Sequence, residues 1–106
     1  MFYIISLKSK ILINKMIFKN KSILVTGGTG SFGQAFIEEI LNNHKPKKIV
    51  VYSRDEMKQY LLKQKLRKYK GNIVRYFIGD IRDLNRLNLA MQDIDLVIHA
   101  AALKQV

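Results

Sequence analysis

The segment from Thr26 to Gly33 reads T-G-G-T-G-S-F-G and constrains the fold more than any other part of the chain. Read from Gly28 it has the spacing G-x-G-x-x-G, and read from Gly27 the spacing G-x-x-G-x-x-G. Such glycines permit a tight turn from a strand into a helix, a close approach of the backbone to a pyrophosphate, and close packing of the helix on the strand. The helix N-terminus then offers free N–H groups and a partial positive charge to phosphates.

The flanking segments supply the context that this motif requires. Ser22–Thr26 is a short apolar run that predicts a buried parallel strand, and apolar residues from Phe32 to Asn42 recur at helical spacing. Ser31 and Gln34 stand three apart, which predicts a capping box at the start of this helix. With a second strand about twenty residues further on, the pattern predicts a dinucleotide-binding site. The alternative is a glycine-rich turn that binds no ligand.

The remaining elements alternate along the chain. We expect strands at 48–52, 73–78 and 95–99, a helix from 53 to about 70, and a short helix at 84–91. The order βαβαβαβ predicts an α/β fold, a partial Rossmann-type doubly wound parallel sheet of the first four strands in spatial order 3-2-1-4. The helices after the first and second strands are expected on one face. The 95–99 strand is expected to be an edge of this sheet with unpaired backbone groups.

Residues 1–20 are set apart from the domain that we expect over residues 21–106. Their apolar runs are broken by Lys8 and Lys10 and fall far below the roughly 18 residues that a membrane span needs. The positive charges follow the first apolar run, and no small-residue cleavage site is present, which argues against a secretory signal. We therefore expect an N-terminal extension, with the true start at Met16, and a cytoplasmic protein.

A formal net charge of +11 raises the question of a polyanionic partner. Residues up to Lys21 hold five lysines and no acid, and much of the remaining excess lies between Lys58 and Lys70 at the spacing of a solvated helix face. We find no aromatic-interleaved basic motif and expect neither nucleic acid nor a membrane as partner. His44 and His99 are too few and too far apart for a metal site. The absence of cysteine excludes a thiolate metal cluster and fits a reducing compartment.

The residues at the end of the second predicted strand indicate whether the cofactor is NAD or NADP. An acidic residue there usually holds the ribose 2′-hydroxyl of NAD, whereas an arginine accommodates the 2′-phosphate of NADP. The chain has Ser53 and Arg54 first, followed by Asp55 and Glu56, so the hydroxyl and the guanidinium favour NADP. The alternative is that Ser53 and Glu56 form a capping box and that Arg54 is solvated.

Two further segments follow strand ends. In the run G-D-I-R-D, Asp80 can accept a hydrogen bond from an adenine amino group and Ile81 offers an apolar wall to the ring. Alternatively, Asp83 caps the next helix and Asp80 is a turn residue. Small residues at Ala100 and beyond let the chain pass close to the nicotinamide half of a cofactor. Lys104 follows at the carboxyl edge of the sheet, where ligands bind in open α/β folds, although a lone lysine there is more often solvated.

Together these segments resemble one enzyme family. The motifs T-G-G-T-G-S-F-G, Y-S-R-D-E-x-K-Q, F-I-G-D-I-R-D and H-A-A-A-L-K-Q-V are similar to those of the inverting UDP-N-acetylglucosamine 4,6-dehydratases, extended short-chain dehydrogenases of polysaccharide and pseudaminic acid biosynthesis. The resemblance runs from about Lys21 to Val106. It implies oxidation at C4 of the sugar with NADP+, elimination of water across C5 and C6, and return of the hydride to C6 with inversion at C5.

The resemblance also implies contacts at four places along the chain for the cofactor and at Lys104 for the sugar nucleotide. The pyrophosphate would lie at Thr29, Gly30, Ser31 and Phe32, within the cofactor-binding loop that Gly27 and Gly33 complete. The adenosine phosphate would lie at Ser53, Arg54, Asp55, Glu56, Met57 and Lys58, the adenine at Asp80 and Ile81, and the inner half of the cofactor at Ala100.

The family's Tyr-x-x-x-Lys pair and its acid and base residues would come after Val106. Tyr60 is not this tyrosine, because it lies within a predicted helix and the fourth position after it is Gln64. We therefore expect an N-terminal fragment that lacks the catalytic residues, is inactive alone, and belongs to a homo-oligomer when full length. A sugar-nucleotide epimerase or reductase of the same superfamily and a non-enzymatic NADP-binding module are the alternatives.

Overall fold

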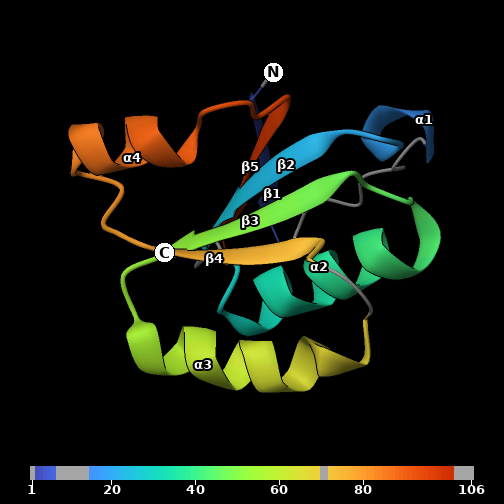
Figure 1. Ribbon diagram of the computed structural model, residues 1–106, viewed down its shortest axis with the longest axis horizontal. Coiled ribbons are helices and arrows are strands. Elements are labelled where there is room, and N and C mark those ends of the chain that lie inside the picture. The colour runs from blue at the N-terminus through green and yellow to red at the C-terminus, as the bar shows by residue number, and fades with distance from the viewer. Residues whose placement is uncertain (1, 7–14, 70–71, 102–106) are drawn as a thin grey trace.

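The structure is a computed structural model that describes residues 2–6, 15–69 and 72–101. Strands and helices alternate along most of this length (Figure 1). The strands are β1 (Phe2–Ser6), β2 (Ser22–Thr26), β3 (Lys48–Ser53), β4 (Val74–Ile78) and β5 (Leu96–Ala101), and the helices are α1 (Lys15–Phe18), α2 (Ser31–Asn43), α3 (Glu56–Lys65), the 3₁₀ helix η1 (Leu66–Lys68) and α4 (Leu84–Ala90).

All five strands run parallel in one sheet, in the order β1-β5-β2-β3-β4. The four strands expected from the sequence are β2, β3, β4 and β5, and their spatial order is the expected 3-2-1-4. Thr26 pairs with Tyr52 on one side and with His99 on the other, and Ser53 pairs with Ile78. This register brings the glycine turn and the segments after β3, β4 and β5 to the same edge of the sheet.

The strand on the outer side of β5 comes from the N-terminal residues. β1 pairs with β5 over its whole length, from Phe2 opposite Val97 to Ser6 opposite Ala101. The expectation that the 95–99 strand is a sheet edge is therefore wrong, because the interrupted apolar runs of residues 1–20 did not identify a strand there. In a doubly wound sheet of order 3-2-1-4-5-6, β1 takes the place that the fifth strand would occupy.

A chain that begins at Met16 lacks β1 and should expose the outer edge of β5. Unpaired N–H and C=O groups along an edge strand are templates for pairing with another chain, so we expect more of the shortened chain to aggregate. Size-exclusion chromatography with light scattering, on both chains at equal concentration, measures the monomer fraction. Equal fractions would show that β1 does not protect β5.

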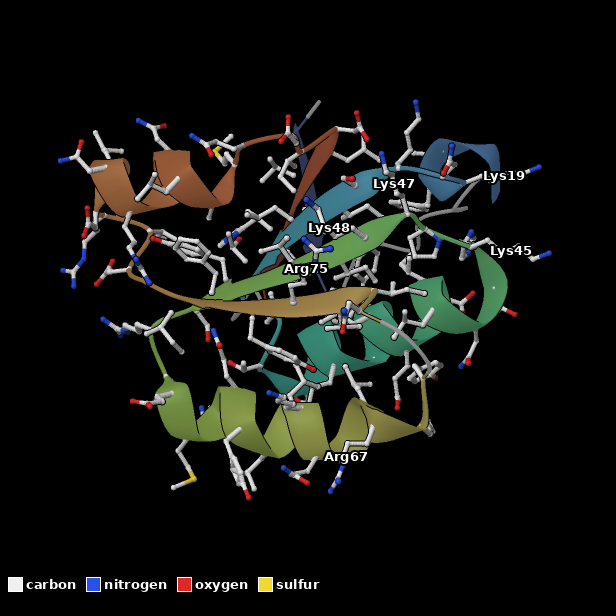
Figure 2. All side chains as sticks on the ribbon, in the orientation of Figure 1. Lys19, Lys45, Lys47, Lys48, Arg67 and Arg75 are labelled. Carbon is white, nitrogen blue, oxygen red and sulfur yellow. The ribbon has the colours of Figure 1, made fainter. Side chains whose placement is uncertain are left out.

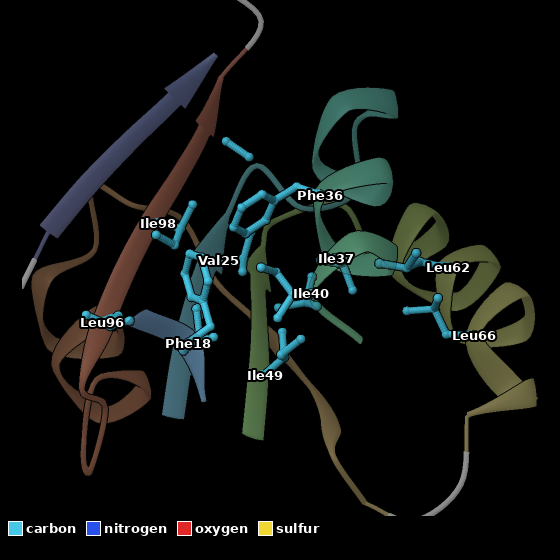
Figure 3. Close-up of a cluster of buried hydrophobic side chains, with 13 residues drawn as sticks. Phe18, Val25, Phe36, Ile37, Ile40, Ile49, Leu62, Leu66, Leu96 and Ile98 are labelled. Atoms are coloured by element: carbon cyan, nitrogen blue, oxygen red, sulfur yellow. The ribbon is translucent and has the colours of Figure 1, made fainter. Parts of the chain in front are cut away.

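Side chains alternate between the two faces of the sheet, and each face has its own core. In β2 every residue is buried, because Ile23 and Val25 face one core and Leu24 faces the other. The first core lies between the sheet and α2 with α3, as expected, and α4 covers the opposite face (Figures 1 and 3). The buried residues of the first core are Phe18, Ile23, Val25, Phe36, Ile37, Ile40, Ile49, Val51, Leu62, Leu66, Leu96, Ile98 and Ala100.

The short helix α1 adds an aromatic side chain to this first core. Phe18 is buried, and its ring lies edge-on to the rings of Phe36 and His44, with centroids 5.9 Å and 5.5 Å away. Residues on both sides of the expected domain boundary at Lys21 therefore contribute to one core. We did not expect this helix from the sequence.

The helices α3 and α4 both begin at aspartates. The carboxylate of Asp55 caps α3 and accepts a hydrogen bond from the backbone N–H of Lys58 at 2.9 Å. The expected capping box of Ser53 and Glu56 is therefore not formed, because β3 extends to Ser53 and the helix begins later. Asp83 caps α4 in the same way, which confirms the alternative interpretation of this residue.

Candidate functional site

The turn between β2 and α2 is packed so closely that two of its glycines have no room for a side chain. Gly27 has φ +71°, which L residues rarely adopt, and a Cβ there would collide with the carbonyl oxygen of Ala100. A Cβ on Gly33 would collide with the carbonyl oxygen of Gly27 and lie 2.6 Å from the Cα of Gly28. The glycine turn, the first turn of α2 and the end of β5 therefore pack backbone against backbone.

Gly30, in contrast, has open space around it. A Cβ there would meet only the carbonyl oxygen of Gly27, at 3.7 Å, among the described atoms within 4 Å. Its φ of −73° and ψ of 167° suit any residue, so the conformation does not require glycine either. Since neither packing nor backbone conformation requires glycine here, a ligand that lies close to the backbone is a reason for the missing side chain. Gly30 therefore fits the position where the backbone approaches a pyrophosphate.

The N-terminus of α2 is available to such a ligand. Gly30 is its N-cap, and no side chain caps the helix. The expected capping box of Ser31 and Gln34 is not formed, because the side-chain amide of Gln34 donates instead to the carbonyl oxygen of Thr29 at 2.9 Å. Ser31, the first residue of α2, is exposed, whereas Thr29 is buried and the partly buried Phe32 packs against the core. The uncapped N–H groups and the open glycine together fit an anionic group.

The ends of β3 and β4 form a second part of the site. Gln59, buried in α3, ties them together, because its side-chain amide donates to Ser53 Oγ at 2.8 Å and to the carbonyl oxygen of Phe77 at 3.0 Å. A cavity of about 420 Å³ opens beside these ends, lined by Ser53, Arg54, Gly79, Asp80, Ile81 and Arg82.

A buried tyrosine holds the backbone segment that follows β4 and lines this cavity. The hydroxyl of Tyr52 donates to the carbonyl oxygen of Asp80 at 2.8 Å. A Cβ on Gly79 would collide with this hydroxyl and lie 2.6 Å from the ring carbon that carries it. The backbone after β4 is thus held at one place, and Asp80 and Ile81 are presented side by side at the carboxyl edge of the sheet.

Asp80 lies between two arginines. Arg82 donates to its carboxylate from Nη2 at 2.7 Å, from Nε at 3.1 Å and from the backbone N–H at 2.9 Å, and Arg54 Nη1 lies 3.7 Å away. The hydrogen bonds from the side chain and backbone of Arg82 chiefly hold the pKa of Asp80 well below its ordinary value of 3.8, and the charges of Arg82 and Arg54 add to this. One negative and two positive charges therefore meet at the cavity at neutral pH.

The carboxyl group of Asp80 should titrate below 3.8, and Arg82→Ala should raise its pKa toward that value. Arg82 binds the deprotonated form, so the contact persists as the pH falls and is lost only near the depressed pKa. Carbon-detected NMR of the carboxyl group during a pH titration measures both midpoints. A midpoint that Arg82→Ala leaves unchanged would contradict the assigned cause.

The first turn of α3 carries the other residues expected at the adenosine phosphate. Asp55 is committed to capping α3, and Glu56, Met57 and Lys58 are exposed beside it. The carboxylate of Asp55 accepts the N–H of Lys58 through one oxygen, Oδ1.

A polar pair that we did not expect from the sequence lies where β2 and β5 end, next to the glycine turn. Thr26 Oγ1 and His99 Nδ1 share a hydrogen bond of 2.6 Å across the carboxyl ends of β2 and β5. Polar residues at the ends of neighbouring buried strands are the signal that could have found the pair. Ala100 is buried just beyond it, and Lys104 lies outside the described residues. Thr26 and His99 line a cavity of about 270 Å³ with Ile81, Leu87, Met91 and Val97.

Metal sites and membrane-spanning helices can be checked in the part of the chain that the structure describes. Within residues 2–6, 15–69 and 72–101, no group of three or more His, Cys, Asp or Glu side chains is placed to hold a metal ion. No helix among the same residues is both long and apolar enough to cross a membrane.

Known proteins resemble this chain over most of its length. It is 54% identical over 89 residues to the UDP-N-acetylglucosamine 4,6-dehydratase (inverting) of Campylobacter jejuni subsp. jejuni serotype O:23/36 (strain 81-176). It is 46% identical over 92 residues to the UDP-glucose 4-epimerase of Rickettsia bellii (strain OSU 85-389). Each match covers 84% of this chain and 26% of the relative, so the chain spans about a quarter of the length of these relatives.

A solved structure and a family model agree with these matches. The X-ray structure of Pen from Bacillus thuringiensis superposes with a TM-score of 0.75 at 44% identity, over 86% of this chain and 27% of that one. The model of the family described as polysaccharide biosynthesis protein matches residues 23–106. The parallel sheet with its glycine turn, the family match and the 54% identity show that this chain belongs to the polysaccharide biosynthesis protein family and is related to the inverting UDP-N-acetylglucosamine 4,6-dehydratases.

Proposed function

We propose that this chain is the NADP-binding N-terminal part of a nucleotide-sugar 4,6-dehydratase that acts on UDP-N-acetylglucosamine. The observation that carries the cofactor proposal is Gly30, a glycine with open space at the uncapped N-terminus of α2. The identity to the Campylobacter relative, which is named for this reaction, supports the substrate. A dehydratase of this kind is a lyase.

NADP, when bound, would supply the hydride acceptor and donor for the sugar. The residues of this chain would bind and orient it. The pyrophosphate would rest on the backbone at Gly30 and on the first N–H groups of α2. The adenine would lie against Ile81 with its amino group near Asp80, and the backbone at Ala100 would pass beside the inner half of the cofactor.

The charges at the cavity after β3 and β4 favour NADP over NAD. Arg54 and Arg82 bring two guanidinium groups to one carboxylate, which leaves an excess positive charge for a 2′-phosphate. Asp55, the first acid after β3, is engaged in capping α3. The hydroxyl of Ser53 accepts from Gln59 and retains its own proton to donate to a phosphate oxygen.

The remainder of the proposal concerns the whole protein. Lys104 would contact the sugar nucleotide, and the catalytic Tyr-x-x-x-Lys pair with its acid and base residues would be supplied by the part of the relatives that this chain does not match. The whole protein would act in the cytoplasm as a homo-oligomer. The cysteine-free composition fits that reducing compartment.

A chimera tests the proposal. Residues 23–106 would replace the matching segment of the Campylobacter dehydratase, and we expect the chimera to turn over UDP-N-acetylglucosamine, whereas the 106-residue chain alone does not. A chimera that binds NADP+ but is inactive would contradict the dehydratase assignment. Turnover by the chain alone would show that the catalytic groups lie within it.

The similarity to the rickettsial UDP-glucose 4-epimerase supports a second candidate, an epimerase of the same superfamily. A parallel chimera with the remainder of that relative separates the two. An active epimerase chimera beside an inactive dehydratase chimera would favour the epimerase.

A further inference from the structure

The outward side of α3 carries large apolar side chains that no described residue covers. Met57, Tyr60 and Leu61 are 65%, 53% and 58% exposed. Their spacing of three and four residues places them on one side of the helix. The opposite side, with Gln59 and Leu62, is the buried one. The outward side of α3 thus carries an apolar stripe of Met57, Tyr60 and Leu61 that no described residue covers, and α3 itself lies at the outside of the fold (Figure 1).

Cations border the uncovered stripe. The exposed cations beside it are Lys58 and Lys63 of α3 and Arg67 of η1, which points away from the sheet in Figure 2. Lys65, also exposed, instead donates to Gln34 Oε1 on α2 at 3.3 Å. Glu56 is the one acidic residue within α3 and η1. We call Met57, Tyr60 and Leu61, together with Lys58, Lys63 and Arg67, the α3 face.

We infer that the α3 face rests on a membrane surface that contains anionic lipids. A helix that lies in a bilayer interface buries aliphatic and aromatic side chains and is bordered by lysines. The long aliphatic stems of those lysines let their ammonium groups reach the headgroups. The net charge of +11 adds a long-range attraction to an anionic surface.

A membrane surface fits the α3 face better than a protein does. A stable protein interface buries roughly 800 Å² on each partner, which three side chains on one helix do not supply. A second copy of the chain would bring the lysines that border both helices together, with one glutamate on each helix to offset them. The expectation of no membrane partner took the basic residues from Lys58 to Lys70 as a solvated helix face, and the exposed Met57, Tyr60 and Leu61 beside them are the observation that it lacked.

The other cluster of cations lacks the apolar part. Lys19, Lys45, Lys47, Lys48 and Arg75 lie toward the amino ends of the strands (Figure 2). The exposed large apolar side chains of the described residues lie elsewhere, on α3, at the end of β4 and around α4. Asp93 also lines the cavity that Lys47, Lys48 and Arg75 share. Charge alone distinguishes this cluster, so it does not carry the inference.

Leu61→Glu and Leu89→Glu form a matched pair for the test. Leu89 is 55% exposed on α4, so both changes replace an exposed helical leucine and lower the net charge equally. Each full chain would be sedimented with vesicles of about 70% phosphatidylcholine and 30% phosphatidylglycerol, and with phosphatidylcholine vesicles alone. We expect the unchanged chain and Leu89→Glu to bind the anionic vesicles, and Leu61→Glu to bind roughly tenfold more weakly. Added salt should weaken all binding.

Three outcomes would overturn the inference. The first is that the unchanged chain does not sediment with anionic vesicles, and the second is that both variants lose binding equally. The third is that the chain is oligomeric in solution and that Leu61→Glu alone makes it monomeric without affecting vesicle binding. Thermal unfolding of both variants checks that they fold. Tyr60→Gln, which adds no charge, provides a second test of the same stripe.

Discussion

Replacement of Gly33 by alanine is expected to destabilise the native fold of this chain strongly. The added Cβ would collide with the carbonyl oxygen of Gly27 and lie 2.6 Å from the Cα of Gly28, and both contacts are to backbone. The glycine turn cannot yield without moving β2 away from α2, where the core is built. We expect a loss of about 3 kcal/mol or more in the free energy of unfolding, measured by urea denaturation.

Gly30→Ala is the matched control for this result. The space around Gly30 is open and its backbone conformation suits alanine, so the free energy of unfolding should change by less than about 0.5 kcal/mol. The same variant should nevertheless lose cofactor affinity, because a Cβ would stand where the pyrophosphate approaches. Equal destabilisation by the two substitutions would contradict the distinction between a packing glycine and a binding glycine.

Arg54→Ala should lower the affinity for NADP+ by about 10- to 150-fold, the worth of hydrogen bonds to a charged group. The affinity for NAD+ should hardly change, because NAD+ has no phosphate at this position. Paired titrations of the full chain with each cofactor, at one ionic strength, measure the effect.

Arg67→Ala is the control for charge alone, since it removes an exposed arginine on η1 outside the lining of the cavity. It should leave both affinities unchanged. If Arg54→Ala weakens NAD+ and NADP+ equally, Arg54 has a structural role, and the preference for NADP arises elsewhere.

The parts of the fold that could be predicted from the sequence are those that local patterns determine. The run S-I-L-V-T is buried on both faces as β2, because a central parallel strand packs helices on either side. β1 could not be predicted in this way, because its strand character depends on pairing with β5 at the far end of the chain. Phe18 was missed for a similar reason, since its partners Phe36 and His44 belong to α2 and its C-cap.

The capping box of Ser53 and Glu56 failed because several residues competed for one role. Ser53, Asp55 and Glu56 all suit a helix start, and the choice was decided by Gln59, which engages the Ser53 hydroxyl from the helix interior. Asp55 was then left to cap α3. Spacing along the sequence does not reveal such a tertiary contact.

The candidate site was predictable where backbone geometry dictates residue type, as at Gly27 and Gly33. It was less predictable where side chains meet across elements. Arg82 reads as a solvated residue of a turn, yet it makes most of the contacts to Asp80. Thr26 and His99 come from distant parts of the chain and meet only because β2 and β5 are neighbours.

A calorimetric titration of the unchanged 106-residue chain with NADP+ and with NAD+ tests most directly the central claim, that this chain binds NADP. The proposed binding at the uncapped N-terminus of α2, with two arginines at the cavity after β3 and β4, predicts one site that holds NADP+ at least roughly tenfold more tightly than NAD+. Tighter binding of NAD+, or binding of neither cofactor, would contradict it.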